Sequence, residues 1–253
     1  MYLTTTGLVI RVTAYNDKDA LLTLLTPNHG KLTVKARGLY RKNSPLSASC
    51  QLLAYGEFTL FEYRSMYTIN EAHSLELFTA LRRDLQKLSL GTYFAQAAEL
   101  LSQEDLPNPE LLSLVLNCLY ALSKLQTPEA LVKAVFELRS AILAGYEPDL
   151  YGCHKCGNPF PDRFDLTEGR LECSTCRDAA SSGLRMPISP GVLESMHYIN
   201  TCESKKLFSF SAGDDTLAQL SAITEGYLAT QLERGFSSLD FYKSLLLPQS
   251  GEP

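Results

Sequence analysis

Several signatures of familiar protein classes are absent from this sequence. Its opening residues, MYLTTTGLVIRV, lack the basic start and the apolar stretch of a signal peptide, and no later run approaches eighteen uninterrupted apolar residues. We therefore expect a cytoplasmic protein with no membrane partner. The sequence also lacks a G-x-x-x-x-G-K phosphate loop, a G-x-S-x-G elbow and any Ser/His/Asp grouping. We accordingly expect no catalytic residues and no enzymatic activity.

Acidic residues are absent from one long segment. The net charge is −5, yet no Asp or Glu occurs between Ala20 and Gly56, where five Lys and Arg residues lie. The local field there is therefore expected to be positive whatever the global sum. Within it, the string KLTVKAR alternates strictly, which places its cations on one face of a strand and its apolar residues on the other. The next string, GLYRKNSP, adds a tyrosine between further cations in a loop.

The first eighty residues have a β pattern. They are rich in Thr, Val, Leu and Tyr and are broken by clusters of turn-forming residues. Five strands with no intervening helix pattern, in about eighty residues, are what a small barrel of the OB type needs. The predicted strands lie at residues 3–14, 20–26, 31–37, 51–63 and 66–77.

The basic segment gives this barrel a candidate ligand. Cations that follow phosphates, combined with aromatic residues on which bases stack, are how OB folds hold single-stranded nucleic acid. An ordinary solvated strand face is the alternative. Five phosphate contacts would make the logarithm of the affinity fall with the logarithm of the salt concentration with a slope of about −3.5 for a single strand. The predicted binding residues are Lys31, Lys35, Arg37, Tyr40, Arg41 and Lys42.

From residue 82 the apolar residues recur at helical spacing, so a first helix is expected there. A later helix is expected to have Thr127 as its N-cap and Pro128 as its first helical residue, and to stop at Gly145. The final PQSGEP is expected to be frayed. Beyond the first helix, the pattern predicts helices at residues 110–125, 127–145, 187–200 and 215–234.

Four of the seven cysteines form two C-x-x-C pairs, in the string CHKCGNPFPDRFDLTEGRLECSTC. The sixteen residues between the pairs match the spacing of zinc ribbons and allow a hairpin that folds one pair onto the other. Two redox motifs or four unrelated thiols are the alternatives, but neither pair sits at a strand-to-helix start. We expect His154 to be exposed or to donate a hydrogen bond beside the site. The pattern predicts one structural Zn²⁺ ion, without an activated water, bound by Cys153, Cys156, Cys173 and Cys176.

The expected fold class is α+β, with an N-terminal five-stranded OB-type β-barrel followed by an α-helical domain that carries the zinc module with its four cysteines. A shift in composition to Pro, Gly, Cys and polar residues marks that module. The expected division is residues 1–79 for the OB-fold DNA-binding domain, 80–147 for the first part of the helical domain, 148–183 for the zinc-binding module and 184–253 for the second helical part.

The chain resembles the RecO family of bacterial DNA recombination and repair mediators over nearly its whole length. The resemblance is most specific in GLVIRVTAYNDKDALLTLLTPNHGKLTVKARG, in AGYEPDLYGCHKCG ahead of the metal module and in ISPGVLESMHYI after it. It implies an OB domain that binds DNA, to which the basic residues above correspond, and a helical domain interrupted by the cysteine module. Where the family tends to show two glycines before the second cysteine pair, this chain has Glu168 and Gly169.

The resemblance also implies a role and a set of partners. These are annealing of complementary strands, loading of the RecA recombinase together with RecR, and contact with the C-terminal tail of single-strand DNA-binding protein, with the protein at the bacterial nucleoid when it acts. The hypothesis is a non-enzymatic mediator of DNA repair and homologous recombination after DNA damage that binds single-stranded and also double-stranded DNA. The alternatives are a zinc-stabilised protein-protein scaffold without direct DNA binding and a zinc hydrolase, which a sphere of four thiolates would exclude.

Overall fold

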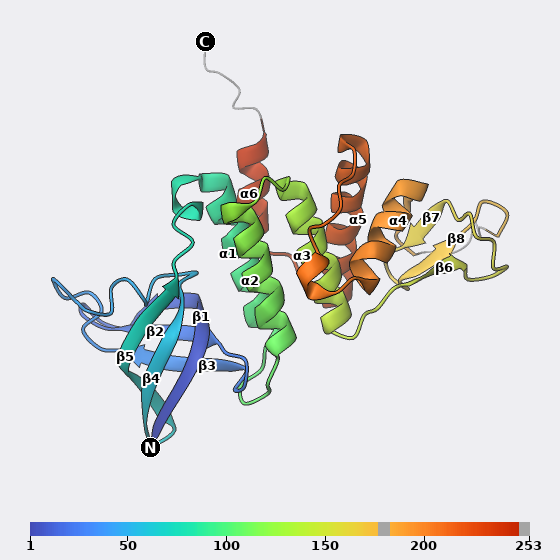
Figure 1. The fold of residues 1–253 in the computed structure, drawn as a ribbon. Coiled ribbons are helices and arrows are strands. Elements are labelled where there is room, and N and C mark those ends of the chain that lie inside the picture. Colours follow the sequence, from blue (N-terminus) through green and yellow to red (C-terminus); the bar gives the residue numbers. More distant parts are fainter. Residues whose placement is uncertain (177–182, 248–253) are drawn as a thin grey trace, which may run out of the picture. The chain divides into compact units, whose positions relative to one another are not determined.

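The computed structural model describes residues 1–176 and 183–247, which Figure 1 shows as a ribbon. The N-terminal part is a closed barrel of five strands in the order β1-β2-β3-β5-β4, with β4 paired to β1. β3 and β5 are parallel, as in the five-stranded Greek-key barrel of the OB fold. The predicted α+β fold with an N-terminal OB-type barrel is confirmed. The strands are β1 (Tyr2–Ala14), β2 (Ala20–Leu25), β3 (Lys31–Ala36), β4 (Tyr55–Tyr63) and β5 (Met66–Glu76).

Alternation of side chains explains the barrel core. In β3, Leu32, Val34 and Ala36 are buried, whereas Lys31 and Lys35 are only half-buried. Successive residues of a strand point to opposite faces, so the apolar set fills the interior and the polar set faces outward. The segment after β3 adds further buried side chains to the same core, namely Leu39, Leu46 and Cys50.

The fourth strand begins later than the sequence predicts. The expected start is residue 51, but residues 51–54 form a turn in which the Ala54 amide donates to the Gln51 carbonyl at 3.0 Å. Leu53 has a φ of 63°, and a left-handed residue cannot continue an extended run. β4 therefore starts only at Tyr55.

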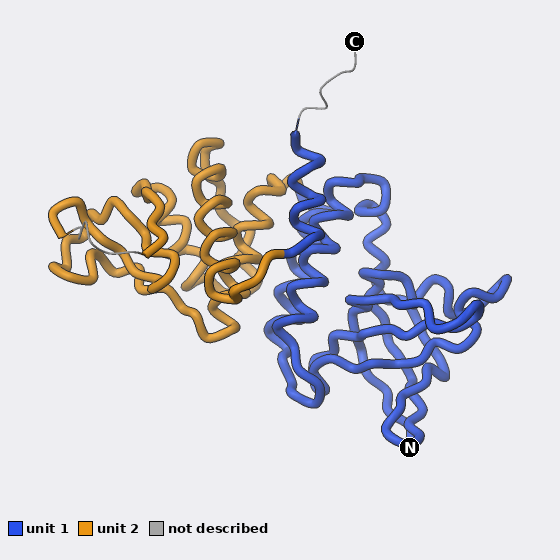
Figure 2. Tube along the Cα trace, turned by 180° about the vertical axis from the view of Figure 1, so that it is seen from behind, with its two compact units in different colours: residues 1–125, 236–253 blue, residues 126–235 orange. Residues whose placement is uncertain are grey.

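The chain divides into two compact units, coloured in Figure 2. The first unit contains residues 1–125 and the segment from Phe236 onward, and its helical elements are η1 (Leu81–Arg83), α1 (Leu85–Leu101), α2 (Pro109–Lys124) and α6 (Ser237–Leu246). Asp84 caps α1 by accepting from two backbone amides, and Asn108 caps α2. The sequence did not predict α6, whose Ser238 hydroxyl donates to Gln96 of α1 at 2.5 Å.

The second unit contains residues 126–235. It combines helices with a small sheet of strand order β6-β8-β7-β9. Its elements are α3 (Glu129–Leu143), β6 (Asp149–Cys153), β7 (Arg163–Asp165), β8 (Arg170–Glu172), β9 (Arg185–Pro187), α4 (Pro190–Thr201), η2 (Ser204–Lys206) and α5 (Asp214–Leu232). The four-part division into domains expected from the sequence stays a prediction.

Several expected helix boundaries differ from those observed. α4 begins at Pro190 and not at residue 187, because residues up to Pro187 form β9. The prediction of Thr127 as N-cap is wrong, because Pro128 occupies that position with a ψ of 135°, and α3 begins at Glu129. α5 ends at Leu232, because Glu233 adopts the left-handed conformation that closes the helix. The segment PQSGEP, which was expected to be frayed, lies outside the described residues. Within residues 1–176 and 183–247, no helix is long and apolar enough to cross a membrane.

A buried cluster of charged and polar side chains connects α3 to α5 inside the second unit. The Lys133 ammonium lies 3.0 Å from a carboxylate oxygen of Glu137 and 2.8 Å from one of Glu225. Thr224 donates to Glu137 at 2.8 Å. Burial raises the pKa of Glu137 to about 7, against the opposing effect of Lys133. The single Lys133 ammonium thus lies between two carboxylates. When Glu137 is protonated, Lys133 and Glu225 form one ion pair without a surplus negative charge.

This buried carboxyl group should make stability depend on pH. The folded pKa of Glu137 lies above its unfolded value of 4.5, so its stabilising effect is present below about pH 4.5 and is lost as pH rises through about 7. The shift corresponds to about 3 kcal/mol in the free energy of unfolding. We expect Glu137→Gln to remove this part of the decline between pH 5 and 8 in urea unfolding. The exposed Glu194→Gln is the control, and an unchanged pH profile in Glu137→Gln would contradict the prediction.

Candidate metal centre and nucleic-acid interface

The four cysteines of the two C-x-x-C pairs lie together in the second unit. Cys153 ends β6, Cys173 follows β8, and their partners Cys156 and Cys176 lie in the turns that follow. All four sulfur atoms lie within 4.8 Å of one another, and the Cys156 and Cys173 sulfurs are 3.7 Å apart. Four thiolates at about 2.3 Å from one tetrahedral ion would be about 3.8 Å apart. The cluster therefore fits one metal ion.

Backbone turns build this cluster. The Gly157 amide donates to the Cys153 carbonyl at 2.8 Å, and the φ of 72° at Gly157 lets the chain reverse directly after the first pair. A hairpin of β7 and β8 returns the chain to the second pair, and in its turn Gly169 has a φ of 64°. The neighbouring Glu168 amide donates to the Asp165 side chain at 3.1 Å. One glycine thus suffices for this hairpin.

The electrostatics of the four thiols favour a cation among them. Burial alone would raise the pKa of Cys153, but backbone amides of Lys155, Cys156 and Cys173 aimed at its sulfur bring that pKa to about 6. Hydrogen bonds with the neighbouring thiols raise the pKa of Cys176 to about 12. A cation between the sulfurs would stabilise all four thiolates at once.

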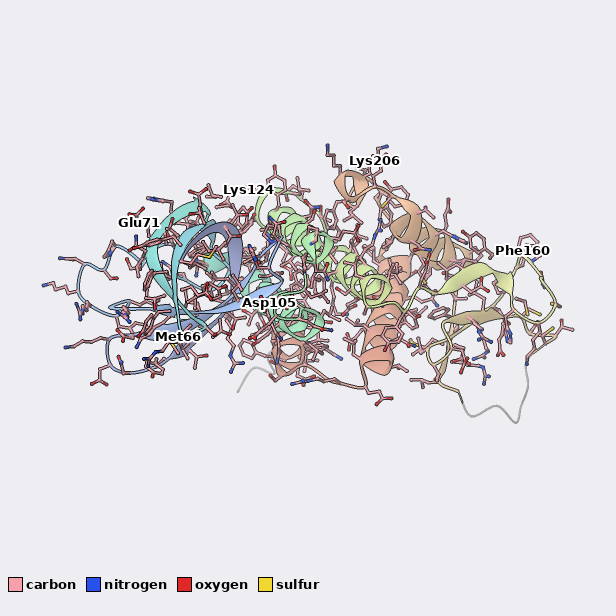
Figure 3. All side chains as sticks on the ribbon, turned by 90° about the horizontal axis from the view of Figure 1, so that it is seen from below. Met66, Glu71, Asp105, Lys124, Phe160 and Lys206 are labelled. Atoms are coloured by element: carbon pink, nitrogen blue, oxygen red, sulfur yellow. The ribbon has the colours of Figure 1, made fainter. Side chains whose placement is uncertain are left out.

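Charged residues surround the cluster without joining it. Glu172 is buried, and its carboxylate lies 2.6 Å from Arg185, 3.3 Å from His154 and 3.6 Å from Lys155. His154 thus contacts Glu172 and is not one of the clustered ligands. At the outer end of the module, Figure 3 labels Phe160, whose side chain is exposed.

Contacts between the module and α5 fix the hairpin to the helices of its own unit. The rings of Phe164 and Tyr227 meet edge to face with centroids 5.3 Å apart, and Gln231 donates to the Leu166 carbonyl at 2.8 Å. Because these contacts come from the β7–β8 hairpin, any change that unfolds the cluster should also loosen α5.

The structure separates the predicted nucleic-acid residues into two groups. Two of them have partners within the first unit. The Lys31 ammonium donates to the Glu99 carbonyl in the last turn of α1 at 3.0 Å, where a cation is favoured by the helix dipole. Lys35 lies 3.4 Å from the Asp19 carboxylate and stacks over the Tyr15 ring at 4.4 Å. Both cations therefore already have partners within the fold in the absence of a ligand.

The other basic residues are exposed. Arg37, Arg41 and Lys42 make no ion pair and no side-chain hydrogen bond among the residues that the structure describes. Their segment is ordered by successive turns, because the Arg41 amide donates to the Gly38 carbonyl at 3.1 Å and the Ser44 amide to the Arg41 carbonyl at 3.2 Å. The Gly38 amide is also held by the Asp19 carboxylate at 2.8 Å. These three cations are therefore presented to solvent by a fixed backbone.

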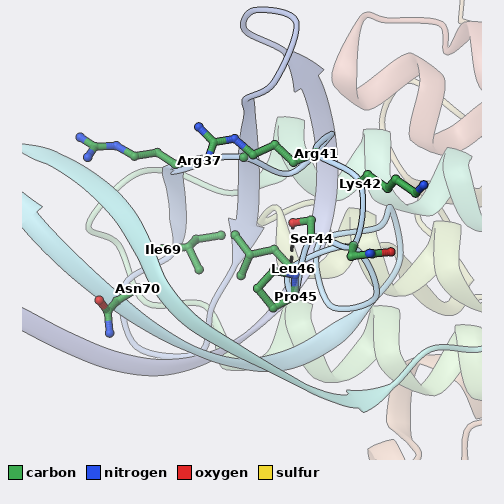
Figure 4. Close-up of a pocket in the computed structure, with 10 residues that line it drawn as sticks. Arg37, Arg41, Lys42, Ser44, Pro45, Leu46, Ile69 and Asn70 are labelled. Carbon is green, nitrogen blue, oxygen red and sulfur yellow. Dashed lines mark hydrogen bonds between the residues drawn. The ribbon is translucent and has the colours of Figure 1, made fainter.

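A cavity of about 300 Å³ lies beside this segment. Figure 4 shows Arg37, Arg41 and Lys42 along one side and Leu46, Ile69 and Asn70 along the other. Tyr40 is half exposed but does not line it. Sequence reasoning did not predict the side of the cavity that is formed by Pro45 and Leu46 after the basic segment and by Ile69 and Asn70 of β5. The sequence shows a proline close to the cations and an asparagine within a strand pattern, and neither indicates that the two segments lie side by side.

Nearly the whole chain is similar to known proteins. Residues 1–78 match the family model for the recombination protein O N terminal, and residues 82–240 match the one for the recombination protein O C terminal. A protein of Acetivibrio thermocellus named "DNA repair protein RecO" is 34% identical over 246 residues, which cover 96% of this chain and 97% of the relative. Relatives of the same name occur in Heliobacterium modesticaldum, with 30% identity over 98% of this chain and 91% of the relative, and in Alkaliphilus metalliredigens, with 27% identity over 97% and 100%.

Proposed function

Because this chain belongs to the RecO family, we propose that it is a DNA repair protein that binds single-stranded, and also double-stranded, DNA through its barrel. In this role it anneals complementary strands and, with RecR, helps to load a recombinase at the nucleoid. It also contacts the C-terminal tail of single-strand DNA-binding protein. These activities involve binding and positioning of strands rather than covalent chemistry.

The observation that carries the proposal is the exposed basic segment on an OB-type barrel. Three cations without partners in the described structure lie on a backbone that turns hold in place, and an exposed tyrosine lies among them. Neutralising two phosphate backbones at such a surface reduces their repulsion, which allows complementary strands to approach. We propose Arg37, Arg41 and Lys42 as the phosphate contacts and Tyr40 as a stacking residue, with Lys31 and Lys35 in supporting positions.

We propose Zn²⁺ as the ion of the four-cysteine cluster. Thiolate ligands in tetrahedral number and closed geometry are typical of structural zinc, and such a site leaves no position for a reactive water. The ion would then stabilise the second unit and take no part in strand binding directly. Metal content of the purified protein, measured by mass spectrometry, should give one zinc per chain.

Salt dependence tests the DNA contacts. Three phosphate contacts by exposed cations should make the logarithm of single-strand affinity fall with the logarithm of salt concentration with a slope of about −2, compared with about −3.5 for five contacts. Fluorescence anisotropy with a labelled oligonucleotide between about 50 and 200 mM salt measures the slope.

Two substitutions sharpen this salt titration. Arg41→Met should reduce the magnitude of the slope by about 0.7, because one phosphate contact is lost. Lys31→Met should leave the slope unchanged, because its ammonium is engaged with α1. A protein with no measurable affinity at low salt would refute DNA binding and favour the scaffold alternative. Equal effects of the two substitutions would place Lys31 among the DNA contacts.

A further inference from the structure

We propose that the cavity beside the basic segment binds one unpaired nucleotide of a DNA strand, with the base against Leu46 and Ile69, its edge at Asn70 and its phosphate at Arg37 and Arg41. This inference rests on the proposed function and assigns a subsite within it. Its consequence is that the barrel distinguishes an open strand from a paired one by contact with the base, in addition to contact with the backbone.

A β-bulge places an asparagine at the wall of the cavity. In the pairing of β4 with β5, Ile69 lies opposite Leu60 and Glu71 lies opposite Thr59, so Asn70 has no partner residue in the ladder. Consecutive residues of a regular strand point to opposite faces, but the extra residue of a bulge re-aims its side chain. Ile69 is buried and Asn70 is exposed, and both residues line the cavity.

The chemistry of Asn70 matches an unpaired base. Its carboxamide carries a donor and an acceptor side by side, and every base has a donor next to an acceptor on its Watson–Crick edge. Rotating the amide by half a turn exchanges the two groups, so the contact requires an open edge but no particular base. In a duplex that edge is occupied, and exposing it would cost a few kcal/mol in unpairing.

The remaining walls fit the rest of a nucleotide. Leu46 and Ile69 are 8% and 5% exposed, and their aliphatic surface can receive the flat face of a base. Arg37 and Arg41, on the opposite side, offer planar guanidinium groups of the kind that bind phosphate in a bidentate way. A volume of about 300 Å³ is at the lower end for small-ligand sites, which suits one nucleotide. An acidic peptide would satisfy the cations but leave the carboxamide corner without a matched partner.

The test compares two probes of equal charge. One is a labelled single strand of about 16 nucleotides, the upper end of the site size of an OB fold, and the other is an abasic phosphodiester of the same length. Asn70 is exposed, so Asn70→Ala should fold. We expect it to weaken binding of the base-bearing strand about three- to tenfold, with an unchanged salt slope and unchanged affinity for the abasic strand. His73→Ala, on the same strand but outside the cavity, should alter neither.

Each result has a distinct meaning. Equal affinity of wild type and Asn70→Ala for the base-bearing strand would overturn the nucleotide subsite while leaving the proposed function in place. Absence of binding to either probe by the wild type would overturn the proposed function itself. A hexa-aspartate peptide is the third probe. If it displaced the strand from the wild type but not from Asn70→Ala, and if Asn70→Ala bound the strand as tightly as the wild type, the cavity would be a site for an acidic peptide and the subsite would be overturned.

Discussion

Replacement of Cys173 by serine is expected to abolish metal binding and to unfold the cysteine module. A structural zinc site contributes on the order of 10 kcal/mol of binding free energy that is also folding free energy. Cys173 is buried and follows the β7–β8 hairpin that contacts α5, so its loss should lower the stability of the whole second unit. Thermal unfolding followed by circular dichroism, together with zinc analysis, measures both effects.

The control for this substitution is Cys202→Ser. Cys202 lies in the same unit but outside the cluster, so this variant should keep one zinc and nearly the stability of the wild type. Removing zinc from the wild type with a chelator should reproduce the effect of Cys173→Ser. A Cys173→Ser protein that retained stoichiometric zinc and an unchanged melting temperature would show that the cluster is not the metal site.

Simultaneous reversal of Arg37, Arg41 and Lys42 to glutamate is expected to abolish strand binding and annealing. Three phosphate contacts are lost and three like charges are placed where the backbone would lie, so affinity should fall at least about a thousandfold at physiological salt. We choose Lys42 rather than Lys35 because Lys35 is paired with Asp19, and reversing it would also disturb the fold. The measurements are anisotropy with an oligonucleotide and an annealing assay with complementary strands.

A variant of equal net charge separates local from global electrostatics. Reversal of Lys205, Lys206 and Arg234, exposed residues of the second unit, changes the net charge by the same amount. This control should keep most of the affinity, because its charges lie outside the basic segment. Retention of binding and annealing in the first triple variant, with a normal melting temperature, would mean that DNA is bound elsewhere or not at all.

Local patterns explain which features could be predicted from the sequence. Strict alternation in KLTVKAR predicted a strand with one polar face, and β3 has this burial. The spacing of the cysteines predicted their proximity, because two residues between thiols place both sulfurs on one side of a turn. Both features depend on residues that are close in the chain or on a repeat that local geometry dictates.

The features that sequence reasoning missed depend on distant partners. Lys31 read as a free cation because Glu99, which binds it, belongs to a helix much later in the chain. Lys35 read as free because Asp19 lies just before the segment that lacks acidic residues. Asn70 lies in a bulge at the wall of the cavity, and no alternation pattern reveals this bulge. In each case the local sequence indicated the kind of strand or loop correctly, but the partners of the side chain were determined by tertiary packing.

The placement of α6 has a consequence for how the protein is made. The ribosome delivers the barrel, α1 and α2 first, and then all of residues 126–235, before Phe236 and Ser238 can reach α1. Until then Tyr93, which is 1% exposed in the folded chain and packs on the Phe236 ring, lacks that cover. The second unit, which contains the four-cysteine cluster, can therefore fold while the first unit is still open. The barrel is translated before the second unit, yet the unit that contains the barrel is completed after the second unit.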